Sequence, residues 1–213
     1  RGPTNFQVDE RVQYSKNDKN IEILANNLIL KYWDGENLGL FGFVNIPYKK
    51  VNENNGIGDL IVGLGPRKKI NDLHFLSYVS LTLPTGDFNK NLGNGRYDKK
   101  IGLFTTYLNR NNGYDINNVI EYNFAGRNER GVTSLNELYL ASFLGKEISN
   151  KLRIGLGLTD LIKQNDDYDL KVRASARYTA SKFLHFELIG ELPVSTKNMP
   201  KSKGVGVFMR YNL

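Results

Sequence analysis

The sequence predicts an all-β fold: a transmembrane antiparallel up-and-down β-barrel of about twelve strands. Three observations lead to this prediction. Apolar and polar residues alternate with a period of two along most of the chain, the alternating segments are unusually long, and the connections between them alternate in length. No comparable stretch has the apolar spacing of i, i+3 and i+4 that indicates a helix.

Composition excludes several classes of protein. The chain has 213 residues, a formal net charge of +7, no Cys and two His. A disulfide scaffold, a Cys-ligated metal site and a thiol nucleophile are therefore excluded, as is a His-rich metal site. No apolar run approaches the length of a transmembrane helix. We expect residues 1–213 to form a single barrel domain, without a metal or an organic cofactor.

The N-terminus gives little information on the fold. Residues 1–3 read Arg-Gly-Pro, with neither an initiator Met nor the pattern of a signal peptide. We expect that a leader has been removed or that residues 1–3 are an expression scar. The positive charge is compatible with nucleic acid, an anionic membrane surface or acidic solutes as partners. Lys and Arg do not gather in one helix or tail, however, which argues against nucleic acid.

Alternation is clearest over residues 168–178, where apolar and small residues interleave with charged and polar ones. Residues 6–14, 151–159 and 205–213 show the same pattern. Because side chains at i and i+2 share one face of a strand, each segment has one apolar and one polar face. The predicted strands are 4–15, 20–33, 37–48, 57–67, 73–84, 96–109, 113–124, 133–146, 151–161, 167–179, 182–194 and 203–213.

Strand length favours a membrane barrel over a soluble sandwich. Strands of soluble proteins have about 5 or 6 residues, whereas tilted membrane-spanning strands need about 9 to 11. Short connections are predicted near 34–36, 68–72, 110–112, 147–150 and 180–181. Longer ones are predicted near 49–56, 85–95, 125–132, 162–166 and 195–202. Short and long connections thus alternate along the chain, and only the connection at 16–19 departs from this alternation. An even strand number with both chain ends in the periplasm reproduces this pattern.

Proline and aromatic residues fall near the predicted strand ends. Pro47, Pro84 and Pro193 stand where a missing N–H is tolerated. The aromatic residues suit two interfacial girdles, although Tyr is also simply a good strand former. The aromatic residues concerned are Tyr14, Tyr32, Trp33, Tyr48, Tyr107, Tyr122, Phe124, Tyr168, Tyr178 and Tyr211.

One region carries a motif. Residues 56–67 read GIGDLIVGLGPR, and residues 79–98 read VSLTLPTGDFNKNLGNGRYD. This combination resembles a family of outer-membrane proteins described as phenol meta-pathway channels. The resemblance implies a twelve-stranded barrel that passes small, often hydrophobic molecules. It covers about a fifth of the chain. Residues 206–213 also resemble the C-terminal signal that the barrel-assembly machinery reads, with Leu213 in place of the usual terminal Phe.

The polar face of each predicted strand supplies candidate pore-lining residues. These are Asp59, Arg67, Arg153, Lys171, Arg173, Arg177, Glu187, Glu191 and Arg210. The basic ladder of one strand next to the acidic residues of the following one forms either a plug or a transverse field that tunes ion selectivity. Phe41 and Phe43 share an inward face. They either contact hydrophobic solutes or fill the lumen.

Asp59 and the Leu-Pro-Thr-Gly-Asp segment each allow two interpretations. Asp59 is either a lumen charge near a constriction or a carboxylate that pairs with a neighbouring strand. Pro84, Thr85, Gly86 and Asp87 begin the longest predicted loop, which either narrows the pore or forms a turn at the rim. The glycines do not form a dinucleotide loop, since no helix follows them.

The sequence predicts a channel for passive uptake of small aromatic, hydrophobic or anionic molecules across the outer membrane of a Gram-negative bacterium. A closed barrel with a structural or surface-interaction role is the second hypothesis. An outer-membrane lipid enzyme using His185 with Ser142 or Ser175 is the third, and we expect no catalysis. Expected partners are small solutes, membrane lipid, lipopolysaccharide and the assembly machinery, and not nucleic acid.

Overall fold

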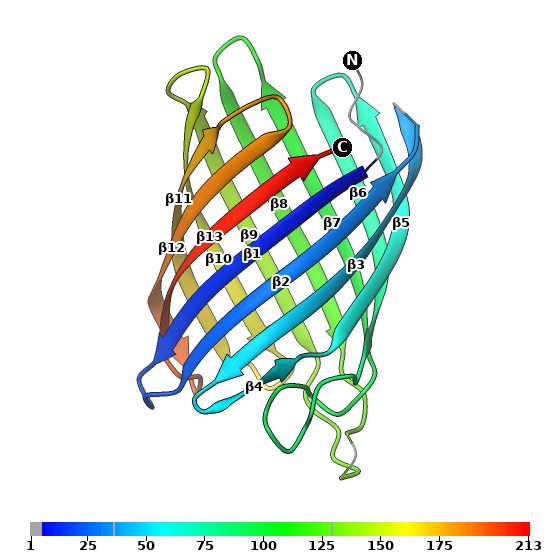
Figure 1. Cartoon of the computed structure of the whole chain (residues 1–213), viewed down its shortest axis with the longest axis vertical. Coiled ribbons are helices and arrows are strands. Elements are labelled where there is room, and N and C mark those ends of the chain that lie inside the picture. The colour runs from blue at the N-terminus through cyan, green and yellow to red at the C-terminus, as the bar shows by residue number, and fades with distance from the viewer. Residues whose placement is uncertain (1–5, 36, 129) are drawn as a thin grey trace.

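The computed structural model describes residues 6–35, 37–128 and 130–213 (Figure 1). The expression scar expected at residues 1–3 lies outside these ranges. The strands are β1 (Phe6–Asn17), β2 (Glu22–Trp33), β3 (Leu38–Val51), β4 (Asn54–Ile57), β5 (Leu60–Ile70), β6 (Leu73–Leu83), β7 (Asp98–Asn109), β8 (Tyr114–Phe124), β9 (Glu137–Glu147), β10 (Leu152–Lys163), β11 (Tyr168–Thr179), β12 (Leu184–Lys197) and β13 (Ser202–Asn212). No helix in these ranges is long and apolar enough to cross a membrane.

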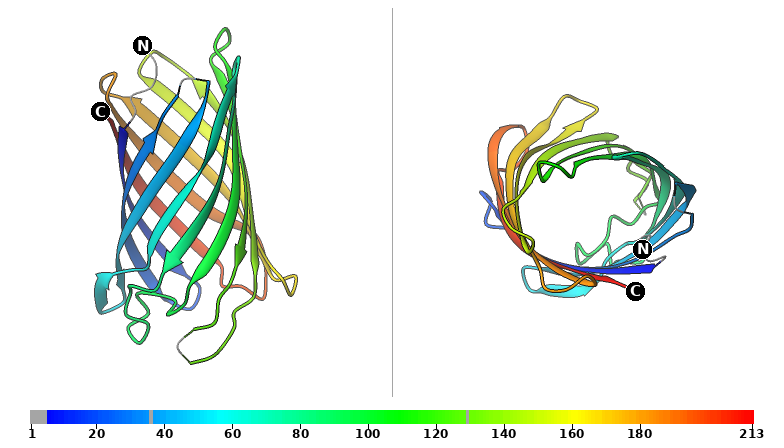
Figure 2. Two further views of the ribbon diagram at one scale, coloured as in Figure 1. Left: turned by 90° about the vertical axis from the view of Figure 1, so that its right-hand side faces the viewer. Right: turned by 90° about the horizontal axis from the view of Figure 1, so that it is seen from above.

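All the strands belong to one antiparallel sheet that closes on itself. Each long strand pairs with its neighbours in the sequence, and β1 pairs with β13 from Gln7↔Asn212 to Asn17↔Ser202. The four-residue β4 folds back on β3 and extends one hairpin, so twelve strands form the barrel wall. Seen along the barrel, the wall is a closed oval ring (Figure 2). The predicted all-β, twelve-stranded barrel is thus confirmed.

The two faces of the sheet are inverted relative to a soluble protein. Apolar side chains of the outer alternation are exposed, such as Leu156 at 60% and Val207 at 51%. Inner positions on the same strands are covered, such as Arg153 at 8% and Phe208 at 5%. Most buried side chains of the barrel are polar, including Asp9, Asp115, Asp169 and Glu191. This arrangement is that of a barrel that faces lipid outside and encloses polar groups.

The barrel ends differ in their connections. Both termini and the short turns lie at one end, here called the terminal end, and the longest loops lie at the other, the loop end (Figure 1). By the rule that periplasmic turns are short, the terminal end faces the periplasm. The long loops are 84–97 and 125–136. The longer connections predicted near 162–166 and 195–202 are wrong, because only residues 164–167 and 198–201 separate those strands.

The aromatic residues form bands at both ends of the outer face. Tyr32, Tyr107, Tyr178 and Tyr211 are exposed near the terminal end, whereas Tyr14, Tyr48, Tyr122 and Phe124 are exposed near the loop end. Such bands match the interfacial girdles of membrane barrels. Trp33 is an exception to the prediction. It alternates with Tyr32 and therefore shares the inner face with Lys31, which contacts Asp9.

Two of the prolines do not end their strands as predicted. β3 continues past Pro47 to Val51, and β12 continues past Pro193 to Lys197. Both sit where the hydrogen-bond ladder is interrupted. Pro47 follows the last β3–β5 pair, and Pro193 adjoins a register shift opposite Lys171. A missing N–H costs nothing at such points, so a strand can pass through a proline there.

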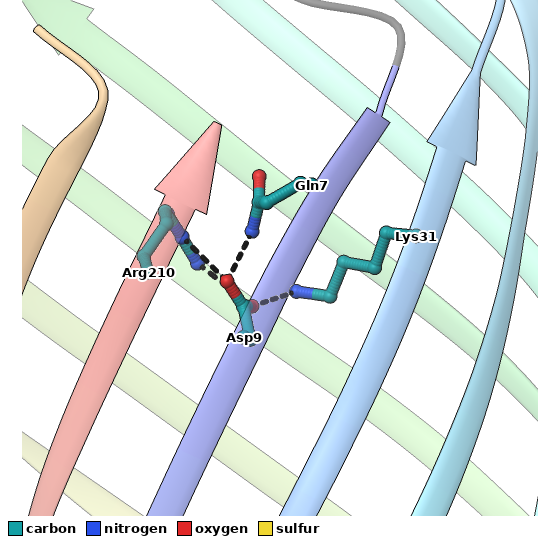
Figure 3. Close-up of polar contacts among 4 residues, drawn as sticks. All are labelled: Gln7, Asp9, Lys31 and Arg210. Atoms are coloured by element: carbon teal, nitrogen blue, oxygen red, sulfur yellow. Dashed lines mark hydrogen bonds and ion pairs between the residues drawn. The ribbon is translucent and has the colours of Figure 1, made fainter. Parts of the chain in front are cut away.

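The closing seam between β13, β1 and β2 is held by one buried carboxylate (Figure 3). Asp9 on β1 has 0% exposure. It accepts hydrogen bonds from Lys31 Nζ on β2 at 2.5 Å, from Arg210 Nε on β13 at 3.1 Å and from Gln7 Nε2 at 2.6 Å. A buried carboxylate is tolerated only with such partners. Asp9 therefore ties together the first, second and last strands of the barrel.

Replacing Asp9 with Asn removes the only carboxylate that contacts Lys31 and Arg210 among the described ion pairs. Because two half-buried cations lose the buried carboxylate that pairs with them, we expect a loss of about 3 kcal/mol in the free energy of unfolding. Urea unfolding of the barrel in lipid vesicles, followed by its shift in gel mobility, measures this. Asp72→Asn is the control: this exposed carboxylate lies 3.8 Å from Arg110 and should contribute at most about 1 kcal/mol. Equal midpoints for the two variants would contradict the role of Asp9.

Candidate functional site

The two halves of the sequence motif contact each other at the loop end. Thr85 Oγ1 donates to the carbonyl oxygen of Gly58 at 2.8 Å and accepts from the backbone N–H of Leu60 at 2.9 Å. Thr85 thus fastens the start of loop 84–97 to the start of β5. A hydroxyl suits both contacts, because its single oxygen can donate one hydrogen bond and accept another.

Asp59 completes this attachment. Its Oδ1 accepts the N–H of Gly86 at 3.0 Å, and its Oδ2 accepts the N–H of Asn94 at 2.6 Å. A Cβ on Gly93 would lie 2.2 Å from Asp59 Oδ1, so glycine permits the close approach. The carboxylate therefore holds both ends of loop 84–97 against the barrel wall. Neither sequence interpretation included this contact with the loop backbone.

The rest of the motif organises the loops. Within loop 84–97, Asp87 Oδ1 accepts the N–H groups of Asn89 and Lys90, which is turn chemistry. Asp98, at the end of the motif, accepts from Arg96 Nε at 2.7 Å and from the N–H of Gly126 at 2.8 Å. Asp98 therefore holds the start of loop 125–136 as Asp59 holds loop 84–97. The motif describes how the two long loops are attached.

A cavity of about 300 Å³ lies inside the barrel near these loops. Asp59 and Asn94 border it, so the attached loop forms part of its wall. Its lining is mixed, with carboxylates, lysines and amides beside a few apolar groups. The lining residues are Asn27, Asn45, Pro47, Lys49, Asp59, Ile61, Thr82, Asn94, Asp98, Lys100, Glu121, Asn123, Glu137, Tyr139 and Leu161. A small polar solute has hydrogen-bond partners throughout this space.

Most predicted charges of β10–β12 are paired across or along the strands. Arg153 forms a bidentate pair with Asp115 of β8, with Nε at 2.6 Å from Oδ2. Arg173 contacts Glu191 through Nε at 2.5 Å. Lys171 Nζ lies 2.9 Å from Asp169 Oδ2 and 2.7 Å from Ser202 Oγ. These pairs cross-link the wall, and their charges largely cancel.

The remaining predicted charges lie toward the terminal end. Arg210 belongs to the Asp9 cluster. Arg177 and Glu187 are directly opposite each other in the β11–β12 register. Arg67 is on the inner alternation of β5, on the same face as Lys69. The sequence therefore placed these residues on the polar face of the correct strands, but it did not indicate which of them pair.

Phe41 and Phe43 lie on the opposite wall with a third aromatic residue, Tyr78. The rings of Phe41 and Phe43 are 5.7 Å apart, and Phe43 meets Tyr78 edge to face at 5.5 Å. Two glycines make room for them. A Cβ on Gly63 would lie 2.3 Å from the Phe43 ring, and one on Gly102 would lie 2.4 Å from Tyr78. The inner wall of β3–β7 thus carries an aromatic cluster.

Several residues at this site were not predicted. Tyr78 donates to Glu121, which also accepts from Lys100 at 2.8 Å. Asp9, Arg11 and Lys31 line the seam. Arg11 and Asp9 stand at alternate positions of β1 and could have been found from the alternation. The contact between Tyr78 and Glu121 could not, because it depends on strand register.

The residues considered for catalysis are not brought together. His185 Nδ1 lies 3.1 Å from Thr179 Oγ1. Ser142 alternates with the inward Phe143 and bonds to Asn118 at 2.8 Å on the outer face. A serine nucleophile requires a histidine within hydrogen-bond reach. Over the described ranges, no such Ser–His contact occurs at His185.

Solved structures with the same architecture include membrane channels and autotransporter translocator domains. An outer-membrane channel from Pseudomonas putida F1 superposes with a TM-score of 0.78 at 15% identity, over 100% of this chain and 96% of that one. The KdgM porin gives a TM-score of 0.62 at 11% identity, over 97% and 99% of the two chains. Its complex with disordered oligogalacturonate gives 0.61 at 9% identity, with the same coverage. The search of curated proteins finds no match.

These likenesses place the fold among outer-membrane β-barrels. In sequence, the family model described as "Putative MetA-pathway of phenol degradation" matches residues 4–211, almost the whole chain. The resemblance seen in residues 56–98 therefore extends to nearly every strand. The chain belongs to this phenol-degradation family.

Proposed function

We propose that the protein is a passive channel that admits small molecules carrying both an aromatic or hydrophobic part and an anionic group. The observation that carries the proposal is the two-sided interior. The wall of β3–β7 presents Phe41, Phe43 and Tyr78, whereas the wall of β10–β13 and β1 presents arginines and lysines. A solute with a ring and a carboxylate has complementary groups on both walls.

The comparisons support transport more than catalysis. Both similar structures are described as a channel or a porin, and the KdgM porin has been captured with an oligogalacturonate, which is a polyanion. We infer that this chain likewise handles small solutes and carries out no enzymatic reaction. Its expected partners also include membrane lipid, lipopolysaccharide at the outer loops and the assembly machinery that recognises β13.

A closed structural barrel is the second candidate, because one observation favours it. Arg153, Lys171 and Arg173 are each engaged by a carboxylate, and such pairs can fill a lumen as well as line it. A barrel of twelve strands is intermediate between small filled barrels and wide porins. Conductance distinguishes the two functions.

We expect the purified barrel to form discrete, low-conductance steps in a planar lipid bilayer, with reversal potentials in asymmetric salt that show a preference for anions. The cations of the inner wall are the physical reason for that preference. A sample of the same protein that is left unfolded, as judged by gel mobility, serves as the control. A folded barrel that remains silent in the bilayer would favour the structural role instead.

Replacing Asp59 with Ala should release loop 84–97 from the wall. Hydrogen bonds to a charged group each contribute about 1.5–3 kcal/mol, and Asp59 accepts two from this loop. We expect larger and noisier single-channel currents, because the loop borders the cavity. Asp87→Ala is the matched control: this motif carboxylate bonds only within the loop in the described structure. Currents that are identical in wild type and Asp59→Ala would show that the loop does not restrict the pore.

A further inference from the structure

One row of inner residues crosses five strands in register near the terminal half of the barrel. Arg153 pairs with Arg177, Arg177 with Glu187, Glu187 with Phe208 and Phe208 with Arg11. Neighbours in a row lie side by side on the same face of the sheet. The row continues to Glu147 on β9, which stands opposite Arg153, so this band of the wall holds three guanidinium groups, two carboxylates and one aromatic ring.

The arginines of this wall fall into two groups. In Arg153, Arg173 and Arg210 the Nε donates to a carboxylate at 2.6, 2.5 and 3.1 Å respectively. The Nε atoms of Arg11 and Arg177 are also buried, but they have no hydrogen-bond acceptor among the described residues. Neither side chain forms an ion pair within that part of the chain. Arg11 lies over the face of Phe208, with its Cζ 5.3 Å from the ring centre.

The charges around these two arginines do not balance. Glu187 stands between them in the row, directly opposite Arg177. Asp9 in the neighbouring row is shared by Lys31 and Arg210, and Arg153 pairs with Asp115 and stands opposite Glu147. In this part of the wall five cations therefore face four carboxylates, and one positive charge remains. Buried guanidinium N–H groups without acceptors are costly, so an anion that supplied the acceptor would be stabilised there.

Space is available beside the row on the side of the loop end. The next row in register contains Gly155, Ser175, Ile189 and Gly206, with Gln13 on β1. The two glycines have no side chain to cover the arginines. A small cavity of about 20 Å³ also adjoins Arg11, between Gly206 and Glu191. An anionic group that enters from the loop end can thus approach Arg11. Arg177 lies further along the same row, beyond Phe208 and Glu187.

We propose that Arg11 and Arg177 form the contact site for the carboxylate of a permeating solute, and that the single excess charge favours a monocarboxylate over a dicarboxylate. This inference rests on the proposed channel function and identifies the specificity-determining residues within it. The planar guanidinium suits a carboxylate, with parallel N–H donors for its two oxygens. The paired Lys171 and Arg173 contribute wall structure and little selectivity.

Benzoate binding to the folded, detergent-solubilised barrel tests the site without requiring conduction. Isothermal titration should give an affinity for benzoate that falls about tenfold in Arg177→Gln and in Arg11→Gln, since each variant loses a hydrogen-bonded charge worth about 1.5 kcal/mol. Phthalate, a dianion of similar size, should bind wild type more weakly than benzoate. Each variant is first checked for folding by its heat-dependent shift in gel mobility.

The matched control is the double variant Lys171→Gln with Asp169→Asn. It removes a cation of the same strand together with its partner, so the net charge of the wall is unchanged. This variant should keep the benzoate affinity and reversal potential of wild type, whereas Arg177→Gln should lower the ratio of anion to cation permeability. Compared with Arg177→Gln, the Arg177→Lys variant should recover the anion selectivity more than the benzoate affinity. Lysine restores the positive charge but not the two parallel N–H donors of the planar guanidinium.

The outcomes separate the two proposals. A conducting barrel whose benzoate affinity is unaffected by Arg11→Gln and Arg177→Gln would refute the site and leave the channel standing. Equal losses in the control double variant would also refute it, since the effect would then be general to the wall. A barrel that binds benzoate through Arg177 but never conducts would support the site and overturn the channel.

Discussion

The structure depends on the requirement that every backbone N–H and C=O within the bilayer has a partner. Lipid supplies none, so a sheet can cross the membrane only by closing on itself. Here the closing pair is β1 with β13, in unbroken register from Gln7↔Asn212 to Asn17↔Ser202. Closure fixes an inside and an outside for every strand, and the period-two alternation then sends apolar residues to lipid and polar residues inward.

The interior consequently has to be stabilised by polar contacts. Asp9 pairs with two cations from other strands and Asp115 with one, and Glu121 links Tyr78 to Lys100. These polar contacts stabilise the interior of the barrel, as apolar packing stabilises the core of a soluble protein. The same chemistry explains the motif, in which Asp59 and Asp98 bind the backbone of the two long loops. Charges that are left over, chiefly on Arg11 and Arg177, are the ones available to a solute.

Much of the fold could be predicted from the sequence because the alternation is a local property. The inner faces of β10, β11 and β13, and their charged residues, follow directly from it. Pairing does not, because it depends on register between strands: Arg173 Nε donates to Glu191, whereas Arg177 Nε has no acceptor among the described residues, although both stand on one face of β11. The lengths predicted for the connections at 164–167 and 198–201 were too great, because composition does not show the backbone geometry of a turn. Asp166 and Asn198 adopt positive φ values of 62° and 53°, which lets four residues reverse the chain where the composition indicated longer loops.

The seam has a consequence for how the barrel forms. Its contacts join residues from opposite ends of the chain, including Leu213, whose N–H donates to Phe6 at 3.0 Å. All other long strands pair with a sequence neighbour, so the seam alone carries a very large contact order and must close last. Until β13 has been synthesised and delivered, both edges of the sheet carry unpaired donors and acceptors. An incomplete chain therefore cannot reside stably in lipid, and stable insertion requires the final strand.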